Sequence, residues 1–205
     1  MKCLIISKRR FGYTFRMRIV MSILALIPLM AIGAVFVDGM GTEWFGTIRG
    51  GIEATFGITF PSPQNRLYYL SKMAGASALW ILIAAFWVNP LRTYVRFDLV
   101  EFKKLLGAAA IGYAFLHFLL FIASYDFAAG RIAGLFGTHL ALGAGLAALL
   151  VIAIVPHVRA WYKLLYIGIV LVIVHLLLGY RELTPPHIAA VTLLSLGLAL
   201  RLIKR

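Results

Sequence analysis

Acidic residues are scarce in this chain, and cysteine is almost absent. Among its 205 residues are 7 Asp and Glu, 20 Lys and Arg and 1 cysteine, so that only 13% of the chain is charged. A soluble domain usually has about a quarter of its residues charged, and the low charge excludes that class. The lone Cys3 excludes an internal disulfide. No Asp or Glu lies inside the long apolar runs, which disfavours a proton relay or a transporter built on buried carboxylates.

Long apolar runs dominate the sequence instead. Hydrophobic residues make up 62% of the chain, and its mean hydropathy is +0.95. A helix needs about 20 apolar residues to cross a membrane, and six runs approach that length: 19–37, 67–88, 105–124, 136–155, 164–179 and 187–200. The sequence therefore predicts an all-α integral membrane protein, a six-transmembrane-helix bundle that forms a single domain over residues 19–205 after a basic tail over residues 1–18. Residues 125–135 are expected to form an outer loop, and Pro90 is expected to mark the inner end of the second helix.

The basic residues are distributed unevenly along the chain. Most of them fall on one side of the predicted bundle, among them Arg92, Arg96, Lys103, Lys104 and Arg201, whereas most of the acids fall on the other. Such a distribution places the basic loops in the cytoplasm, so it predicts that both termini are cytoplasmic. It also explains the net charge of +13 without nucleic acid. The expected partner of this surface is membrane lipid, and the expected location is a bacterial inner membrane.

Two histidines lie inside the predicted spans. His117 follows Lys104 by 13 residues and His175 follows Lys163 by 12, so each lies about 18–20 Å from the inner end of its helix. The two helices run in the same direction, and the imidazoles therefore reach one depth in the outer half of the bilayer. Such a pair can hold one iron from both faces of a porphyrin. Alternatively, each ring bonds to a neighbouring carbonyl or hydroxyl, whereas zinc is less favoured because no cysteine and few carboxylates accompany the pair.

Small residues lead up to the first of these histidines. Gly107, Ala110 and Ala114 precede His117 at helical spacing and share its face. Similar stripes run along the second helix (Ser71, Gly75 and Ala78) and the fourth (Gly137, Ala141, Ala144 and Ala148). Faces of this kind allow close helix packing, and they also leave room for a flat cofactor.

Three segments of the chain carry a resemblance to a known family. "MAGASALWILIAAFWVNPLR", "KKLLGAAAIGYAFLHFLLFIASYD" and "YKLLYIGIVLVIVH" are similar to ferric-reductase-like transmembrane domains, and within these to the YedZ-type haem-binding membrane subunits of periplasmic methionine sulfoxide reductase systems. The similarity extends over about residues 64–200. The positions that carry it are Gly75, Ala78 and Leu79, then Asn89, Pro90, Leu91 and Arg92, then Lys103, Lys104, Leu106 and Gly107, then His117 with Tyr125, and Tyr166 with His175.

The resemblance implies that His117 and His175 ligate a b-type haem. Family members usually carry a further histidine toward the cytoplasm, where this sequence has Tyr162, so one haem is expected. His139 and His187 are expected on the outer side. Contact of either ring with the haem edge or with a quinone is an alternative that the sequence leaves open. Arg131 and Arg181 are candidates to pair with the haem propionates on that side.

The function predicted from these features is that of a haem b-binding electron-transfer subunit. It would pass electrons to an outer-side, periplasmic acceptor, together with a redox partner protein or within a larger membrane complex, rather than act as a complete enzyme. The alternative is a non-redox structural or assembly subunit that keeps the same scaffold. A flavin or a quinone beside the haem also remains open.

Overall fold

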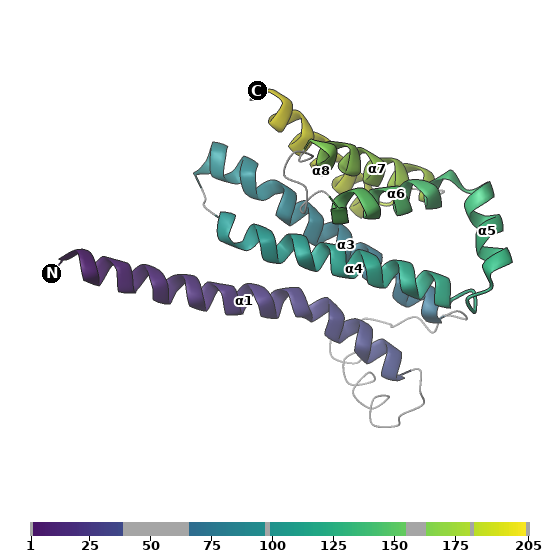
Figure 1. Ribbon diagram of the computed structural model, residues 1–205, viewed down its shortest axis with the longest axis horizontal. Coiled ribbons are helices and arrows are strands. Elements are labelled where there is room, and N and C mark those ends of the chain that lie inside the picture. The colour runs from purple at the N-terminus through teal and green to yellow at the C-terminus, as the bar shows by residue number, and fades with distance from the viewer. Residues whose placement is uncertain (1, 39–65, 97–98, 155–162, 181–182, 204–205) are drawn as a thin grey trace.

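The computed structural model describes residues 2–38, 66–96, 99–154, 163–180 and 183–203, with side chains from residue 19 onward, and within these ranges the chain is helical and has no strand. The elements, in chain order, are α1 (Lys2–Asp38), α3 (Arg66–Pro90), η1 (Leu91–Val95, a π-helical turn), η2 (Val100–Phe102, a 3-10 turn), α4 (Lys103–Ala123), α5 (Ala129–Thr138), α6 (Leu140–Ile154), α7 (Leu164–Gly179) and α8 (Pro185–Ile203) (Figure 1).

Several of these helices are long and apolar enough to cross a membrane. The stretches that meet this condition are Ile19–Val37, Arg66–Val95, Val100–Ala123 and Pro185–Ile203. Taken together, α5 and α6 are also long and apolar enough, but the chain bends by 101° at their junction. α7 is a shorter apolar helix of 16 residues. The described helices are therefore compatible with an integral membrane protein of four spans, or of five if the bent pair is one span.

The fourth predicted helix, 136–155, is wrong as a single straight element. Its first residues belong to α5, and His139 leaves the helix in an extended conformation before α6 begins at Leu140. The predicted outer loop over 125–135 is also wrong in part, because α5 starts at Ala129. Hydropathy is continuous across this segment and so hides the break, whereas Gly137 and Thr138 directly before it are weak helix formers.

The other boundaries agree with the apolar runs to different degrees. α7 occupies the predicted 164–179, and α3 ends at Pro90 as predicted. α8 extends beyond 187–200 at both ends. The span predicted at 19–37 continues back through the basic tail, so that α1 has 37 residues. The tail is rich in Lys, Arg, Ile and Met and has no proline, a composition that sustains a helix.

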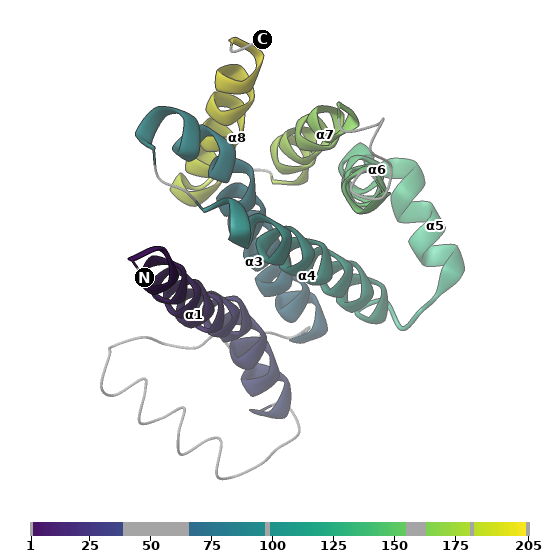
Figure 2. The same cartoon turned by 60° about the vertical axis from the view of Figure 1, so that its left-hand side comes forward.

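The helices form two hairpins that face each other. α3 packs along α4, α6 packs along α7, and α4 and α6 contact each other only sparsely (Figures 1 and 2). α8 lies against both α3 and α7 and so links the hairpins, and α1 lies against α3. The start of α1 and the end of α8 lie at the same end of the molecule, where α3 ends and α4 begins (Figure 1).

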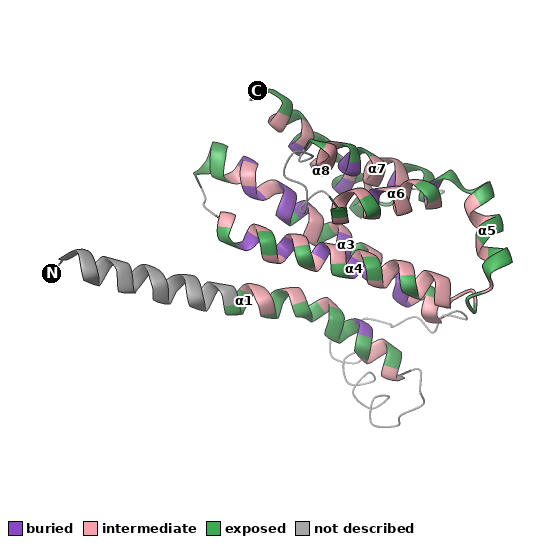
Figure 3. Cartoon of the chain, in the orientation of Figure 1, coloured by how far each residue is buried: buried purple, intermediate pink, exposed green. Residues whose placement is uncertain are grey.

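The packed core is centred on α3. One cluster joins it to α7 and α8 through Phe86, Ile169 and Leu194, and a second joins it to α1 and α4 through Leu70 and Tyr113. The described part of α1 is exposed along most of its apolar surface, as Figure 3 shows. Apolar surface of this kind suits a helix that faces lipid on most sides.

An arginine on α8 supplies a hydrogen bond at the C-terminal end of α3. The carbonyl of Phe86 would normally accept a hydrogen bond from the N–H of residue 90, but Pro90 has no N–H. The Arg201 guanidinium on α8 donates to this carbonyl across 2.5 Å and lies over the Phe86 ring, with 4.1 Å from its carbon to the ring centroid. Arg201 therefore supplies the donor that proline removes.

We expect Arg201→Met to lower the free energy of unfolding by about 2 kcal/mol, because the Phe86 carbonyl then loses a charged donor. In a Pro90→Ala background the same substitution should cost clearly less, since the restored backbone N–H can bond to that carbonyl. Unfolding of the purified protein in mixed detergent micelles, followed by circular dichroism, measures both effects. Equal costs in the two backgrounds would show that the arginine acts through some other contact.

Candidate cofactor site

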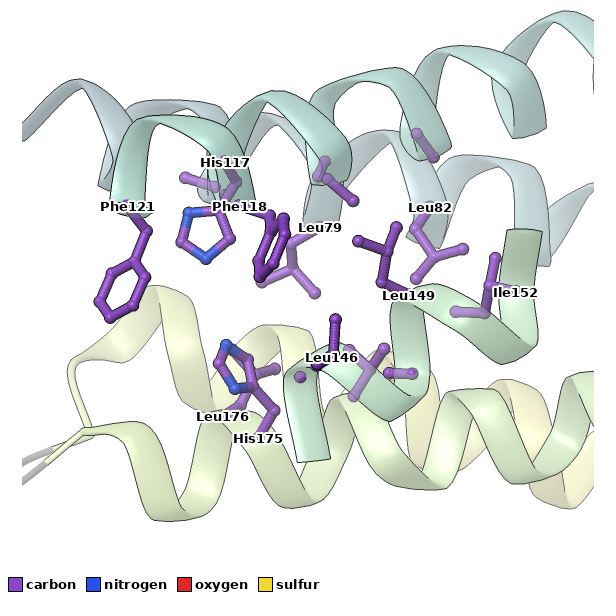
Figure 4. Close-up of a pocket in the computed structure, with 18 of the residues that line it drawn as sticks. Leu79, Leu82, His117, Phe118, Phe121, Leu146, Leu149, Ile152, His175 and Leu176 are labelled. Carbon is purple, nitrogen blue, oxygen red and sulfur yellow. The ribbon is translucent and has the colours of Figure 1, made fainter. Parts of the chain in front are cut away.

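A cavity lies between the two hairpins and is lined mainly by apolar side chains. Its walls come from α3, α4, α6 and α7, with contributions from α5 and from the start of α8. Figure 4 shows His117 from one hairpin and His175 from the other, pointing toward each other across this space. Leu79, Phe118 and Leu146 lie beside them.

His117 is held by a serine on the neighbouring helix. Its Nδ1–H donates to the backbone carbonyl of Ser71 at 2.8 Å, and the Ser71 hydroxyl lies 2.9 Å from the same nitrogen. That hydroxyl also donates to the carbonyl of His117 at 3.1 Å. A carbonyl only accepts, so Nδ1 must carry the ring proton and Nε2 keeps its lone pair.

His175 is held in the same way from α6. Its Nδ1–H donates to the backbone carbonyl of Ala141 at 2.7 Å, which again leaves the lone pair on Nε2. Histidines that bind metals almost always donate their other N–H to a carbonyl, carboxylate or water, and this second bond fixes the ring for ligation. Both imidazoles are thus in the tautomer that a metal ligand requires.

A glycine lies against each ring, one helical turn beyond the carbonyl. A Cβ placed on Gly75 would lie 3.0 Å from Nδ1 of His117, and one placed on Gly145 would lie 2.7 Å from Nδ1 of His175. Both distances are too short for an ordinary contact. The two hairpins therefore hold their histidines in the same way. On the first helix of each hairpin a backbone carbonyl accepts a hydrogen bond from the histidine of the second helix, and a glycine four residues later leaves room for the ring.

The distance between the rings suits one metal ion. Their centroids are 6.5 Å apart, with an angle of 65° between the planes. An imidazole nitrogen binds a first-row metal ion at about 2 Å, and adding roughly 1 Å from each nitrogen to its ring centre gives about 6 Å between two axial rings. In Figure 4 one nitrogen of each ring points at the other ring. The pair therefore fits the two axial positions of an iron porphyrin, whose macrocycle supplies the four remaining ligands.

Two of the three small residues predicted beside His117 lie in the cavity wall. Ala110 and Ala114 line the cavity, whereas Gly107, nearer the N-terminal end of α4, does not. A Cβ on Gly107 would meet nothing within 4 Å, so neither the cavity nor a neighbouring helix requires a glycine there.

The other polar residues predicted for the site lie at or beyond the end of the cavity that Tyr180 and Pro186 line. His187 lines the cavity together with Tyr180, and their ring centroids are 3.8 Å apart. Burial raises the pKa of Tyr180, and Tyr68 adds to this effect, so its hydroxyl stays protonated at neutral pH. His139 and Arg131 are exposed and do not belong to the lining. Arg181 and Tyr162 lie outside the described residues.

Sequence reasoning missed Gly145 and the two backbone carbonyls. The stripe read on the fourth helix was Gly137, Ala141, Ala144 and Ala148, which passes beside Gly145 without including it. Gly145 lies four residues after Ala141, as Gly75 does after Ser71, and this shared spacing was the available signal. Backbone carbonyls have no signature in a sequence.

Among the residues that the structure describes, no group of three or more His, Cys, Asp or Glu side chains is placed to hold a metal ion. No protein-family model matches the chain, and no curated protein or solved structure does so either.

Proposed function

We propose that this chain is a haem b-binding membrane subunit that transfers electrons to an acceptor on the outer side. The observation that carries the proposal is the facing pair His117 and His175, with ring centroids 6.5 Å apart and each Nδ1 bonded to a carbonyl. Two imidazoles that both present Nε2 across an apolar cavity form the ligand set of a low-spin b-type haem.

The protein's own contribution is binding, orientation and exclusion of water. When bound, the haem supplies a one-electron carrier. Ser71 and the carbonyl of Ala141 orient the two ligand rings, and the glycines Gly75 and Gly145 make room for them. Side chains such as Leu79, Phe118 and Leu146 surround the pair with apolar surface, which lowers the local dielectric and tunes the potential of a bound iron.

The proposed placement in the membrane follows from the hairpins and the charges. We propose six crossings, with the bent pair α5 and α6 as the fourth and α7 as the fifth, both termini in the cytoplasm, and a bacterial inner membrane as the location. Arg92, Lys103 and Arg201 lie at the end where α3 and α8 finish and α4 begins, as the positive-inside rule expects. The histidine pair then lies in the outer half, nearer a periplasmic redox partner.

Family membership is part of the same proposal. The resemblance to ferric-reductase-like domains includes Gly75, His117 and His175. These residues lie together in the cavity. The packing of Gly75 on His117 gives a physical reason for a glycine at that point of the motif.

The test is the visible spectrum and haem content of the protein purified from haem-replete cells. We expect the dithionite-reduced protein to show the sharp α-band of six-coordinate low-spin b-haem and a haem-to-protein ratio near one. A colourless preparation would rule out the proposal and favour the structural or assembly subunit. A ratio near two would mean that further ligands exist. Bound flavin or quinone is sought by extraction from the same sample.

A further inference from the structure

The cavity is polar at one end only. Apart from the facing histidines, the only ionisable side chains in its described lining are Tyr180 and His187. Tyr180 directly follows α7, and His187 lies in the first turn of α8. The opposite end is lined by Leu82, Leu149 and Ile152, which Figure 4 shows beyond the histidine pair.

His187 is held so that one ring nitrogen is left for a ligand. Its Nδ1 lies 2.6 Å from the hydroxyl of Thr184, the residue before α8. With that hydroxyl as the donor, the ring proton is on Nε2, which has no hydrogen-bond partner among the described residues. The ring packs on Tyr180 with 3.8 Å between centroids, which fixes its orientation at the cavity's edge.

We propose that Nε2 of His187 donates a hydrogen bond to a carboxylate of the bound porphyrin, at the outer end of the cavity. The inference rests on the proposed haem. A b-type haem carries both of its carboxylates on one edge, and burying an unpaired carboxylate against the leucines of the opposite end is strongly unfavourable. The carboxylate edge therefore faces Tyr180 and His187, and the apolar edge faces Leu82 and Ile152.

Two substitutions separate the hydrogen bond from the packing. His187→Phe keeps a ring on Tyr180 but has no donor, and His187→Gln keeps an N–H donor. His139→Ala is the matched control, because His139 is exposed and lies outside the lining. Haem loss is measured as the rate of transfer from the detergent-solubilised protein to an excess of a soluble haem-scavenging protein. Each variant is also loaded with the dimethyl ester of the same haem, which has no carboxylates.

We expect His187→Phe to lose haem about tenfold faster than the unmodified protein, as the loss of a hydrogen bond to a charged group predicts. His187→Gln and His139→Ala should lose it at nearly the unmodified rate. With the dimethyl ester, His187→Phe and the unmodified protein should behave alike.

Two results would overturn this assignment while leaving the proposed function in place. One is an unchanged rate in His187→Phe with low-spin haem present. The other is an equal acceleration with the dimethyl ester, which would indicate a packing role. Absence of low-spin haem from the unmodified protein would instead remove the proposed function and this inference together.

Discussion

Replacing either His117 or His175 with alanine should abolish the low-spin haem spectrum. In the proposed site each ring would supply one of two axial ligands, and the other imidazole of the described lining, His187, lies at the cavity's edge, where Thr184 and Tyr180 hold it. The remaining haem should be high-spin or absent, which visible and electron paramagnetic resonance spectra of the purified variants distinguish. The loss should be nearly complete for both variants, since one ligand cannot hold iron in the low-spin state alone.

His139→Ala is the control for this pair of variants, since the ring is exposed at the end of α5. Its spectrum should match that of the unmodified protein. A low-spin spectrum that survives His175→Ala would mean that the second ligand is another residue, and the facing geometry would then have to be explained as packing alone.

Gly145→Ala should have an effect nearly as large, although it changes no ligand. The added methyl would lie 2.7 Å from Nδ1 and 2.9 Å from Cε1 of His175, so the ring must move and its bond to the Ala141 carbonyl must weaken. Loss of such a supporting bond typically lowers metal affinity about 10–100-fold. Haem content and dissociation rate of the purified variant measure the change.

Two other glycines provide a graded comparison. Gly75→Ala places its methyl 3.0 Å from His117, so a milder loss is expected, and Gly143→Ala, on the same helix as Gly145, meets nothing within 4 Å. Alanine also favours a helix over glycine by up to about 1 kcal/mol, so Gly143→Ala should be at least as stable as the unmodified protein. Equal haem loss at Gly143 and Gly145 would contradict the steric argument.

The sequence predicted helices well where composition alone decides them. α7 occupies the predicted residues because its apolar run ends at polar or turn residues on both sides. The chain turn at His139 was not predicted in this way, because the segment as a whole is apolar and hydropathy hides the weak helix formers Gly137 and Thr138. The 101° bend between α5 and α6 is a feature that a hydropathy profile does not contain.

One feature of the candidate site, the common depth of its two histidines, was predictable by counting residues along each helix. Equal distance from the basic ends of their helices predicted that His117 and His175 lie at one depth, and the structure brings the two rings together. The sequence left contact with the haem edge open for both His139 and His187, and of these two the structure places only His187 in the cavity's lining. That placement depends on how α8 packs between the hairpins, and that packing has no local sequence signal.

The division of the site between two hairpins has a consequence for biosynthesis. During translation α3 and α4 are synthesised before α6 and α7. The residues that hold His117 are therefore present before His175 has been translated. The first hairpin alone would offer the proposed haem one histidine ligand, so binding at that stage would be reversible. Insertion of the second hairpin would add the second ligand and stabilise the bound haem. Because α4 and α6 contact each other only sparsely, the two halves of a chain without the proposed haem would be joined chiefly through α8. If the proposed haem is bound, its supply during translation would decide whether the two hairpins close on a shared ligand.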